Sequence, residues 1–291
     1  MTHALGLIFA SAFTLSLYDI CKKHSVSGNR AFTVLCLTSG TGFLSVTLAL
    51  ALTGRLAATL ALDFRSVALL LLKSVIVGAS WSLAYWALKT MPVTVMAPIR
   101  ATGPVWTTLA AIAVFAEVPS LRQAVGFLLA FAGCVGFSWT ARREGFCLRS
   151  RAILLAIGAT LFGSLSALYD KCLLNRLGLP PETVLFWFMG GMTVIYLIAV
   201  VAVRRLDATP FTFRATIPAV GILLAVSDFL YFSAVATPDA RISILSTLRR
   251  LSTVGTFLLG GALFHERNLV RKALALAAIL AGVAFLCLKN F

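Results

Sequence analysis

The sequence is poor in charged residues, and above all in acidic ones. Only 12% of its 291 residues are charged, and Asp and Glu together number 10. A soluble domain carries about 25% charged residues. The apolar residues that replace them make up 60% of the chain and fall in long runs. Since about 20 apolar residues in a helix cross the hydrocarbon core of a membrane, the sequence predicts an all-α integral membrane protein.

Patterns typical of metal sites and enzymes are also missing. The six cysteines form no C-x-x-C pair, and with only three histidines beside them no metal-ligand spacing appears. There is no paired nucleophile and base and no glycine-rich phosphate loop. We therefore expect no metal, no cofactor and no enzymatic activity, and we interpret the cysteines as small packing residues.

A cleavable secretory signal is a third absence. The opening "MTHALGLIFA" has neither a basic start nor a small-residue cleavage site, so we expect a retained first helix. The formal net charge of +15 comes from Lys and Arg in short clusters between the apolar runs. Such clusters are typical of membrane topology signals, whereas nucleic-acid binding needs a solvated basic face. No nucleic-acid partner is expected.

The apolar runs predict ten transmembrane helices joined by short loops. The longest polar connection, "ARREGFCLRSR" at 141–151, follows the fifth run. It is the natural joint between two halves. The predicted spans cover residues 4–21, 31–53, 67–88, 93–115, 121–139, 152–173, 183–203, 215–237, 242–264 and 269–288.

The two halves share sequence features. "IRATGPVWTTLAAIAVFAE" (99–117) aligns without gaps on "LRRLSTVGTFLLGGALFHE" (248–266), with Arg100 opposite Arg249 among 7 identities in 19 positions. "SLYDIC" and "ALYDKC" recur 151 positions apart. Because each copy holds five spans, an odd number, the second copy enters from the opposite side of the membrane. Inverted repeats of this kind are typical of secondary transporters with a site at the repeat interface.

We therefore predict a first five-helix repeat at 1–140, a connecting loop at 141–151 and a second repeat at 152–291. The five-plus-five arrangement, with "YDICKK", "APIRATGPVWT", "ALYDKCLL", "PDARISILSTLRRLS" and the helix ends "FAE" and "GGALFHE", resembles the EamA-type branch of the drug/metabolite transporter superfamily. The resemblance covers nearly the whole chain. It implies a transporter, and it implies that the fifth and tenth helices lie away from the pathway. It does not fix the substrate.

The distribution of Lys and Arg predicts the orientation. Counting the residues at span ends with the adjoining loops, 14 lie in loops after odd-numbered spans and seven in the other loops and the termini. The positive-inside rule then places both termini outside the cytoplasm, although the resemblance implies both inside. We follow the count and expect a multi-pass protein of the cytoplasmic (inner) membrane.

Several charges fall inside the predicted spans. A charge at the bilayer centre costs about 2.5–3.5 kcal/mol on insertion scales, so it normally pairs or faces a cavity. Topology brings Asp19 towards Arg100 in one leaflet and Asp170 towards Arg249 in the other. We expect two related polar clusters along a central pathway. Static ion pairs and snorkelling to the interface are the alternatives, and snorkelling also suits Lys73.

Asp228 stands in "AVSDFLYFSAV", which offers no basic neighbour. A carboxylate without a cationic partner suits a group that takes up and releases a proton, so Asp228 is the candidate for proton coupling. The alternatives are a protonated structural Asp, bonded to Ser227 or Tyr231, or a pair with an Arg of another helix.

Aromatic residues beside these charges suggest a binding site, and Tyr85 and Tyr231 follow Ser82 and Asp228 by three residues in matching spans. We predict a secondary transporter for a small polar metabolite, anionic or zwitterionic; a translocase for a lipid or lipid-linked headgroup is the alternative. The expected partners are this substrate and the bilayer, and the protein is a monomer or homodimer. The predicted site residues are Tyr18, Asp19, Trp81, Ser82, Tyr85, Arg100, Tyr169, Asp170, Asp228, Tyr231 and Arg249.

Overall fold

The described part of the chain is helical. The computed structural model describes residues 2–103, 105–106, 121–143, 150–202, 209–237, 248–249, 251–263 and 268–287. The helices are α1 Thr2–Val26, α2 Ala31–Leu52, α3 Leu56–Leu60, α4 Phe64–Thr90, α5 Val93–Ala101, α7 Leu121–Arg143, α8 Ser150–Lys171, α9 Pro181–Ala202, α10 Thr216–Val235, α12 Ser252–Leu263 and α13 Leu269–Cys287. A π-helical turn, η1 Cys172–Arg176, continues α8.

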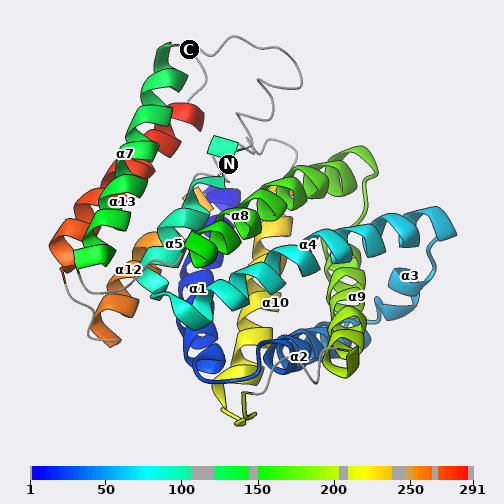
Figure 1. Ribbon diagram of the computed structural model, residues 1–291. Helices are drawn as coiled ribbons and strands as arrows, with labels where there is room; N and C mark the ends of the chain where they lie inside the picture. The colour runs from blue at the N-terminus through cyan, green and yellow to red at the C-terminus, as the bar shows by residue number, and fades with distance from the viewer. Residues whose placement is uncertain are drawn as a thin grey trace.

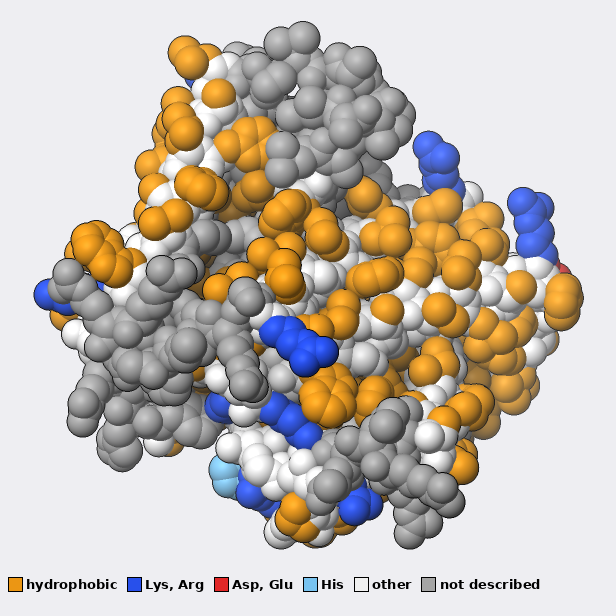
Figure 2. All heavy atoms as spheres, viewed as in Figure 1, with side chains coloured by type: hydrophobic (Ala, Val, Ile, Leu, Met, Phe, Trp, Pro, Cys, Tyr) orange, Lys and Arg blue, Asp and Glu red, His pale blue; other side chains and the backbone are white. Residues whose placement is uncertain are grey.

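Six stretches within these helices are long and apolar enough to cross a membrane. They are Leu5–Val26, Ala31–Leu52, Phe64–Thr90, Arg151–Leu174, Pro181–Ala202 and Thr216–Val235. Ala124–Gly133 and Ser252–Leu263 are shorter apolar helices. Hydrophobic side chains are spread widely over the described part of the face seen in Figure 2. Helices that are apolar on the outside as well as the inside are typical of membrane spans, and the predicted all-α membrane class is confirmed.

The helix ends differ from the predicted spans in informative places. The first helix continues five residues beyond the predicted limit of 21, to Val26, so Lys22 and Lys23 belong to a helix rather than a loop. The short helix α3 was not predicted at all. The predicted spans 93–115 and 242–264 fall partly outside the described residues.

Helices from the two halves of the chain interlock (Figure 1). α1 packs along α10, α4 along α8, α2 along α9, and α5 against α12. The long α7 and α13 lie side by side and form a pair at one edge of the molecule. The halves are therefore not separate globular units, because most of the described core lies between helices of different halves.

Small residues allow the α7–α13 pair to approach closely. A Cβ added at Gly133 would lie 2.6 Å from the carbonyl oxygen of Ala275, and one at Gly282 would lie 2.6 Å from the backbone nitrogen of Ala130. The glycine and alanine faces of these helices are therefore occupied by each other, as expected for helix packing in a membrane.

A hydrogen-bonded clasp holds the α1–α2 turn to the segment that precedes α10. We define the clasp as Asn29, Arg30, Thr209 and Thr212. Asn29 Nδ2 donates to the Thr212 carbonyl (2.7 Å), and the Thr212 backbone nitrogen donates back to Asn29 Oδ1 (3.1 Å). Arg30 Nε donates to the Thr209 carbonyl (2.6 Å). The clasp joins the two halves at the end of the molecule where α1 ends and α10 begins.

Lys23 closes the same end against α4. Its Nζ donates to the carbonyl oxygens of Leu88 and Met91, each at 2.8 Å. These carbonyls lie at the C-terminal end of α4, where helical partners run out and a cation is favourable. Lys23 thereby fixes the end of α1 to the end of α4.

Candidate functional site

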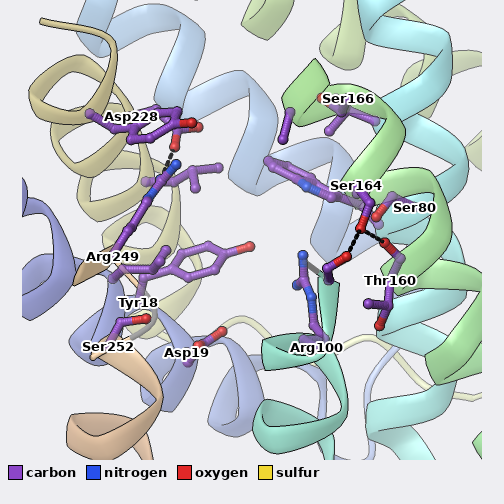
Figure 3. Close-up of a pocket in the computed structure, with 18 of the residues that line it drawn as sticks. Tyr18, Asp19, Ser80, Arg100, Thr160, Ser164, Ser166, Asp228, Arg249 and Ser252 are labelled. Atoms are coloured by element: carbon purple, nitrogen blue, oxygen red, sulfur yellow. Dashed lines mark hydrogen bonds and ion pairs between the residues drawn. The ribbon is translucent and has the colours of Figure 1, made fainter. Parts of the chain in front are cut away.

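A cavity of about 210 Å³ lies between the two halves (Figure 3). Its lining comes from α1, α4 and α5 of the first half and from α8, α9, α10 and α12 of the second. Seven of the residues that line it carry ionisable acidic or basic side chains: Asp19, Lys22, Lys73, Arg100, Asp170, Asp228 and Arg249. Five of the seven were predicted as site residues, and Lys22 and Lys73 were not.

Asp19 pairs with Lys22, one helical turn further along α1. Thr256 Oγ1 also donates to Asp19 (3.3 Å), and Lys22 Nζ lies 4.2 Å from the centre of the Tyr18 ring. Lys22 is only 2% exposed although the sequence pattern placed it in a loop. The predicted Asp19–Arg100 pairing therefore needs correction, because Asp19 takes its cation from its own helix.

Asp170 pairs with Lys73 across the α4–α8 contact. Lys73 is 2% exposed, and its Nζ also lies 4.9 Å from the centre of the Phe188 ring and 5.1 Å from that of Phe232. The predicted partner of Asp170 was Arg249, and snorkelling was one interpretation of Lys73. Both interpretations are wrong, since Lys73 points inward and neutralises Asp170.

Asp228 does have a cationic partner, which comes from a later part of the chain. Arg249 Nη2 lies 2.5 Å from Asp228 Oδ1, and its guanidinium carbon lies 4.0 Å from the centre of the Tyr231 ring. Within the described residues, Arg249 Nε is buried without a hydrogen-bond partner. The local sequence suggested an isolated carboxylate, but the fold supplies an arginine. Proton coupling through Asp228 stays a prediction.

Arg100 reaches the cavity from the opposite wall (Figure 3). It belongs to the last turn of α5, next to Gly163 on α8. The guanidinium Nη2 lies 4.0 Å from the position that a Cβ on Gly163 would take, and Ser80 Oγ lies 3.5 Å from that position. Both are ordinary van der Waals distances, so Gly163 lies next to Arg100 and Ser80. Figure 3 shows Arg100 beside Ser164, facing Tyr18 and Asp19 across the cavity.

Three predicted site residues lie outside the cavity lining. Ser82 Oγ donates to the Gly78 carbonyl (2.8 Å), and Tyr196 Oη donates to the same oxygen (2.8 Å). Tyr85 is buried at 1% exposure. Tyr169 Oη donates to the Leu69 carbonyl (3.0 Å) on α4. Ser82 and Tyr169 thus bond helix backbone around the cavity, whereas the buried Tyr85 hydroxyl has no hydrogen-bond partner among the described residues.

The remaining predicted aromatic residues do line the cavity. Tyr18, Trp81 and Tyr231 are all buried and all contribute to its wall. The Trp81 ring meets that of Phe188 edge to face, with centroids 6.0 Å apart. The cavity therefore has an aromatic part beside its charged part.

Hydroxyl groups were the main component that the sequence analysis missed. Six serine and threonine residues line the cavity without having been predicted: Ser80, Thr160, Ser164, Ser166, Ser252 and Thr253. Thr160 and Ser164 stand four residues apart, on one face of α8. A search for hydroxyl residues at helical spacing within apolar spans would have found them.

Some predicted features lie outside the described residues. They are Glu117 and Glu266, two residues beyond the predicted fourth and ninth spans, Pro104 of "APIRATGPVWT", Arg250 of "PDARISILSTLRRLS", and the middle of the connecting loop at 144–149. Among the residues that the structure does describe, no group of three His, Cys, Asp or Glu side chains could hold a metal ion.

Part of the sequence is similar to a known protein family. Residues 2–139 match the EamA-like transporter family. This segment belongs to that family. The predicted EamA-type resemblance is thereby confirmed over this segment, and together with the apolar helices it supports a multi-pass membrane protein.

A similarity of fold extends beyond the matched segment. A solved structure described as "Crystal structure of protein" is similar to this chain with a TM-score of 0.68 at 16% identity. The likeness covers 98% of this chain and 96% of the other. At that identity it establishes the fold alone, and it does so for both halves of the chain. No curated protein sequence matches the chain.

Proposed function

We propose that this chain is a secondary transporter that moves a small polar metabolite across the cytoplasmic membrane by alternating access. The observation that carries the proposal is the charged cavity lined by helices of both halves. In an inverted-repeat transporter the substrate site lies at the interface between repeats. A cavity at that interface would open to one side or the other as the repeats tilt against each other.

The helix contacts support ten spans in two inverted repeats, at 1–140 and 152–291 with the loop 141–151 between them. If the halves are exchanged, the α1–α10 contact becomes the α8–α4 contact, and the α2–α9 and α7–α13 contacts map onto themselves. Two side-chain hydrogen bonds also correspond between the halves. Ser16 donates to the carbonyl of Ser252 (2.9 Å) and Ser164 to that of Gly103 (3.1 Å). Gly103 lies three residues after Arg100, and Ser252 lies three residues after Arg249, the arginine aligned with it.

The size and charge of the cavity indicate the kind of substrate. Its volume of about 210 Å³ is below the roughly 300–1,000 Å³ of sites for drug-sized ligands. Among the described lining residues, four cations face three carboxylates. A small substrate with a negative group fits this balance better than a cationic one.

Cysteine labelling tests alternating access without knowledge of the substrate. Ser166→Cys on α8 and Ser252→Cys on α12 line the cavity. In a background with the six native cysteines replaced by alanine, we expect both to react with a small membrane-impermeant thiol reagent added to either side of proteoliposomes. Ser39→Cys is the control, because Ser39 is completely buried and outside the lining. Reaction from one side only would contradict a transport pathway.

The orientation is a second testable part of the proposal. Lys22 lines the cavity instead of a loop, which leaves 13 basic residues against seven. The excess still favours both termini outside the cytoplasm. We expect a phosphatase fused after Phe291 to be active and a fluorescent protein there to be dark. Fusions after Cys147 are the control and should behave in the opposite way. A fluorescent fusion at Phe291 would reverse the assignment.

A further inference from the structure

The hydroxyl groups on the Arg100 wall of the cavity have already used their hydrogens. A serine or threonine hydroxyl has one hydrogen to donate and two lone pairs that accept. Here each hydrogen goes to a backbone carbonyl of the protein. The bonds run from Ser80 to Ala159 (2.7 Å), from Thr160 to Ala156 (2.7 Å), and from Ser164 to Thr160 (2.9 Å) and Gly103 (3.1 Å).

These three hydroxyls can therefore act towards a ligand only as hydrogen-bond acceptors, through their lone pairs. Ser80, Thr160 and Ser164 all line the cavity, and Figure 3 shows them grouped around Arg100. A ligand that meets this wall must supply hydrogen-bond donors, because an acceptor would face oxygen lone pairs. A ligand without donors would leave the three oxygens unpaired after displacing water, which costs free energy.

Arg100 has the opposite character. A guanidinium carries five N–H donors in a planar fork and no acceptor, and the fork fits a carboxylate with two parallel bonds. Because it can serve several partners at once, Arg100 can hold a ligand oxygen together with contacts to the protein. The wall thus combines a site for an anionic group with adjacent acceptors for neutral donors.

An ammonium group is a poor candidate for those donors. It would seek a carboxylate, and each carboxylate of the described lining already holds a cation of the protein: Asp19 with Lys22, Asp170 with Lys73 and Asp228 with Arg249. A ligand ammonium would have to displace one of these cations inside the cavity. Hydroxyl groups can donate to Ser80, Thr160 and Ser164 without any such exchange.

We propose, on the basis of the transport function proposed above, that the substrate is a small hydroxylated monocarboxylate. Its carboxylate lies on Arg100, and its hydroxyls donate to Ser80, Thr160 and Ser164. The cavity volume of about 210 Å³ suits a short chain rather than a nucleotide-sized molecule.

Three six-carbon probes separate the chemical possibilities. Gluconate carries a carboxylate and hydroxyls, hexanoate carries the carboxylate alone, and L-norleucine carries a carboxylate and an ammonium. We expect gluconate to raise the melting temperature of the detergent-purified protein and to enter proteoliposomes saturably. Hexanoate and L-norleucine should bind at least 10-fold more weakly, because sites built for hydroxyl groups reject analogues without them.

Single substitutions test which side chains contact gluconate. Thr160→Val and Ser164→Ala should each weaken gluconate binding about 5- to 30-fold, the equivalent of about 1–2 kcal/mol for a lost hydrogen bond, and Arg100→Gln should abolish it. Thr193→Val is the matched control for Thr160→Val. Thr193 on α9 makes the same bond to a carbonyl four residues earlier (2.8 Å, to Met189) but lies outside the cavity lining. Gluconate binding should be unchanged in this control.

Some results would overturn the assignment. Binding of L-norleucine as tight as that of gluconate would exclude the proposed substrate class, and so would the absence of any effect of gluconate on melting and uptake. Full gluconate affinity in Thr160→Val and Ser164→Ala would exclude the proposed hydrogen bonds. The cysteine-labelling experiment is independent of all three probes. It can support the transport function even where the substrate class fails.

Discussion

Replacing Lys73 by methionine should destabilise the folded protein by about 3–5 kcal/mol, because Asp170 would keep a buried charge without its cation. Lys73 is 2% exposed and Asp170 7%. Methionine matches the length of the aliphatic part of lysine, so the loss comes mainly from the charge. The double variant Lys73→Met with Asp170→Asn removes both charges. It should recover most of the stability. Unfolding in a mild detergent measures the free energy of unfolding of the unchanged protein, of Lys73→Met and of the double variant.

The surface pair Arg55–Glu182 is the control for this experiment. Its atoms lie 2.8 Å apart, and the Arg55 side chain is 67% exposed. Removal of an exposed pair costs about 0–1 kcal/mol, so Glu182→Gln should scarcely change the unfolding transition. If Lys73→Met had an effect as small as Glu182→Gln, then Asp170 would not depend on Lys73. The ion pair would lose its structural role.

Gly221→Ala should also have a large effect, because α2 and α10 cross with their backbones in contact. A Cβ at Gly221 would overlap the Thr38 carbonyl oxygen and the Thr41 hydroxyl, and it would lie 2.7 Å from the Gly42 nitrogen. Backbone atoms cannot rotate away, so the helices would have to separate. Overpacking typically costs 1–3 kcal/mol, and we expect about 3 kcal/mol here, measured by the same unfolding transition.

Gly40→Ala provides the matched comparison on α2. A Cβ there would meet only the Thr193 methyl group at 3.7 Å, which is an ordinary van der Waals distance. Replacing glycine by alanine within a helix also gains up to about 1 kcal/mol in helix propensity. Gly40→Ala should therefore be neutral or stabilising. A Gly221→Ala protein as stable as Gly40→Ala would mean that the two helices do not cross as closely as described.

The membrane class and most helices could be predicted from the sequence, because apolar runs of span length carry that information by themselves. The end of α1 could not. Lys22 and Lys23 resemble the start of a loop, but Lys22 is covered by Tyr18 and Asp19 and Lys23 bonds the end of α4. Whether a charge ends a span or lies buried within it depends on partners from elsewhere in the fold.

The positions of the site charges were predicted better than their pairings. Asp19, Arg100, Asp170, Asp228 and Arg249 all line the cavity. Topology could place two charges in the same leaflet, but it could not rank neighbours at a resolution of a few ångströms. Asp170 could reach Lys73 on α4 as well as an arginine near α12, and only the packing of α8 against α4 decides between them.

The direction of the hydroxyl groups was the least predictable part of the site. Serine and threonine in a helix can donate to a carbonyl of the preceding turn or turn towards solvent. Which they choose on α8 depends on the neighbouring helices, as the bond from Ser164 to the Gly103 carbonyl illustrates. A sequence pattern identifies such residues but cannot assign their hydrogens.

The clasp that joins the α1–α2 turn to the segment before α10 has a consequence for the energy needed to open that end. Its contacts are hydrogen bonds among Asn29, Arg30, Thr209 and Thr212, and water can replace each of them for about 0.5–1.5 kcal/mol. A seal of leucine and phenylalanine would instead have to expose hydrocarbon to solvent. Because water can replace the polar contacts of the clasp, opening this end needs less free energy than separating an apolar seal would.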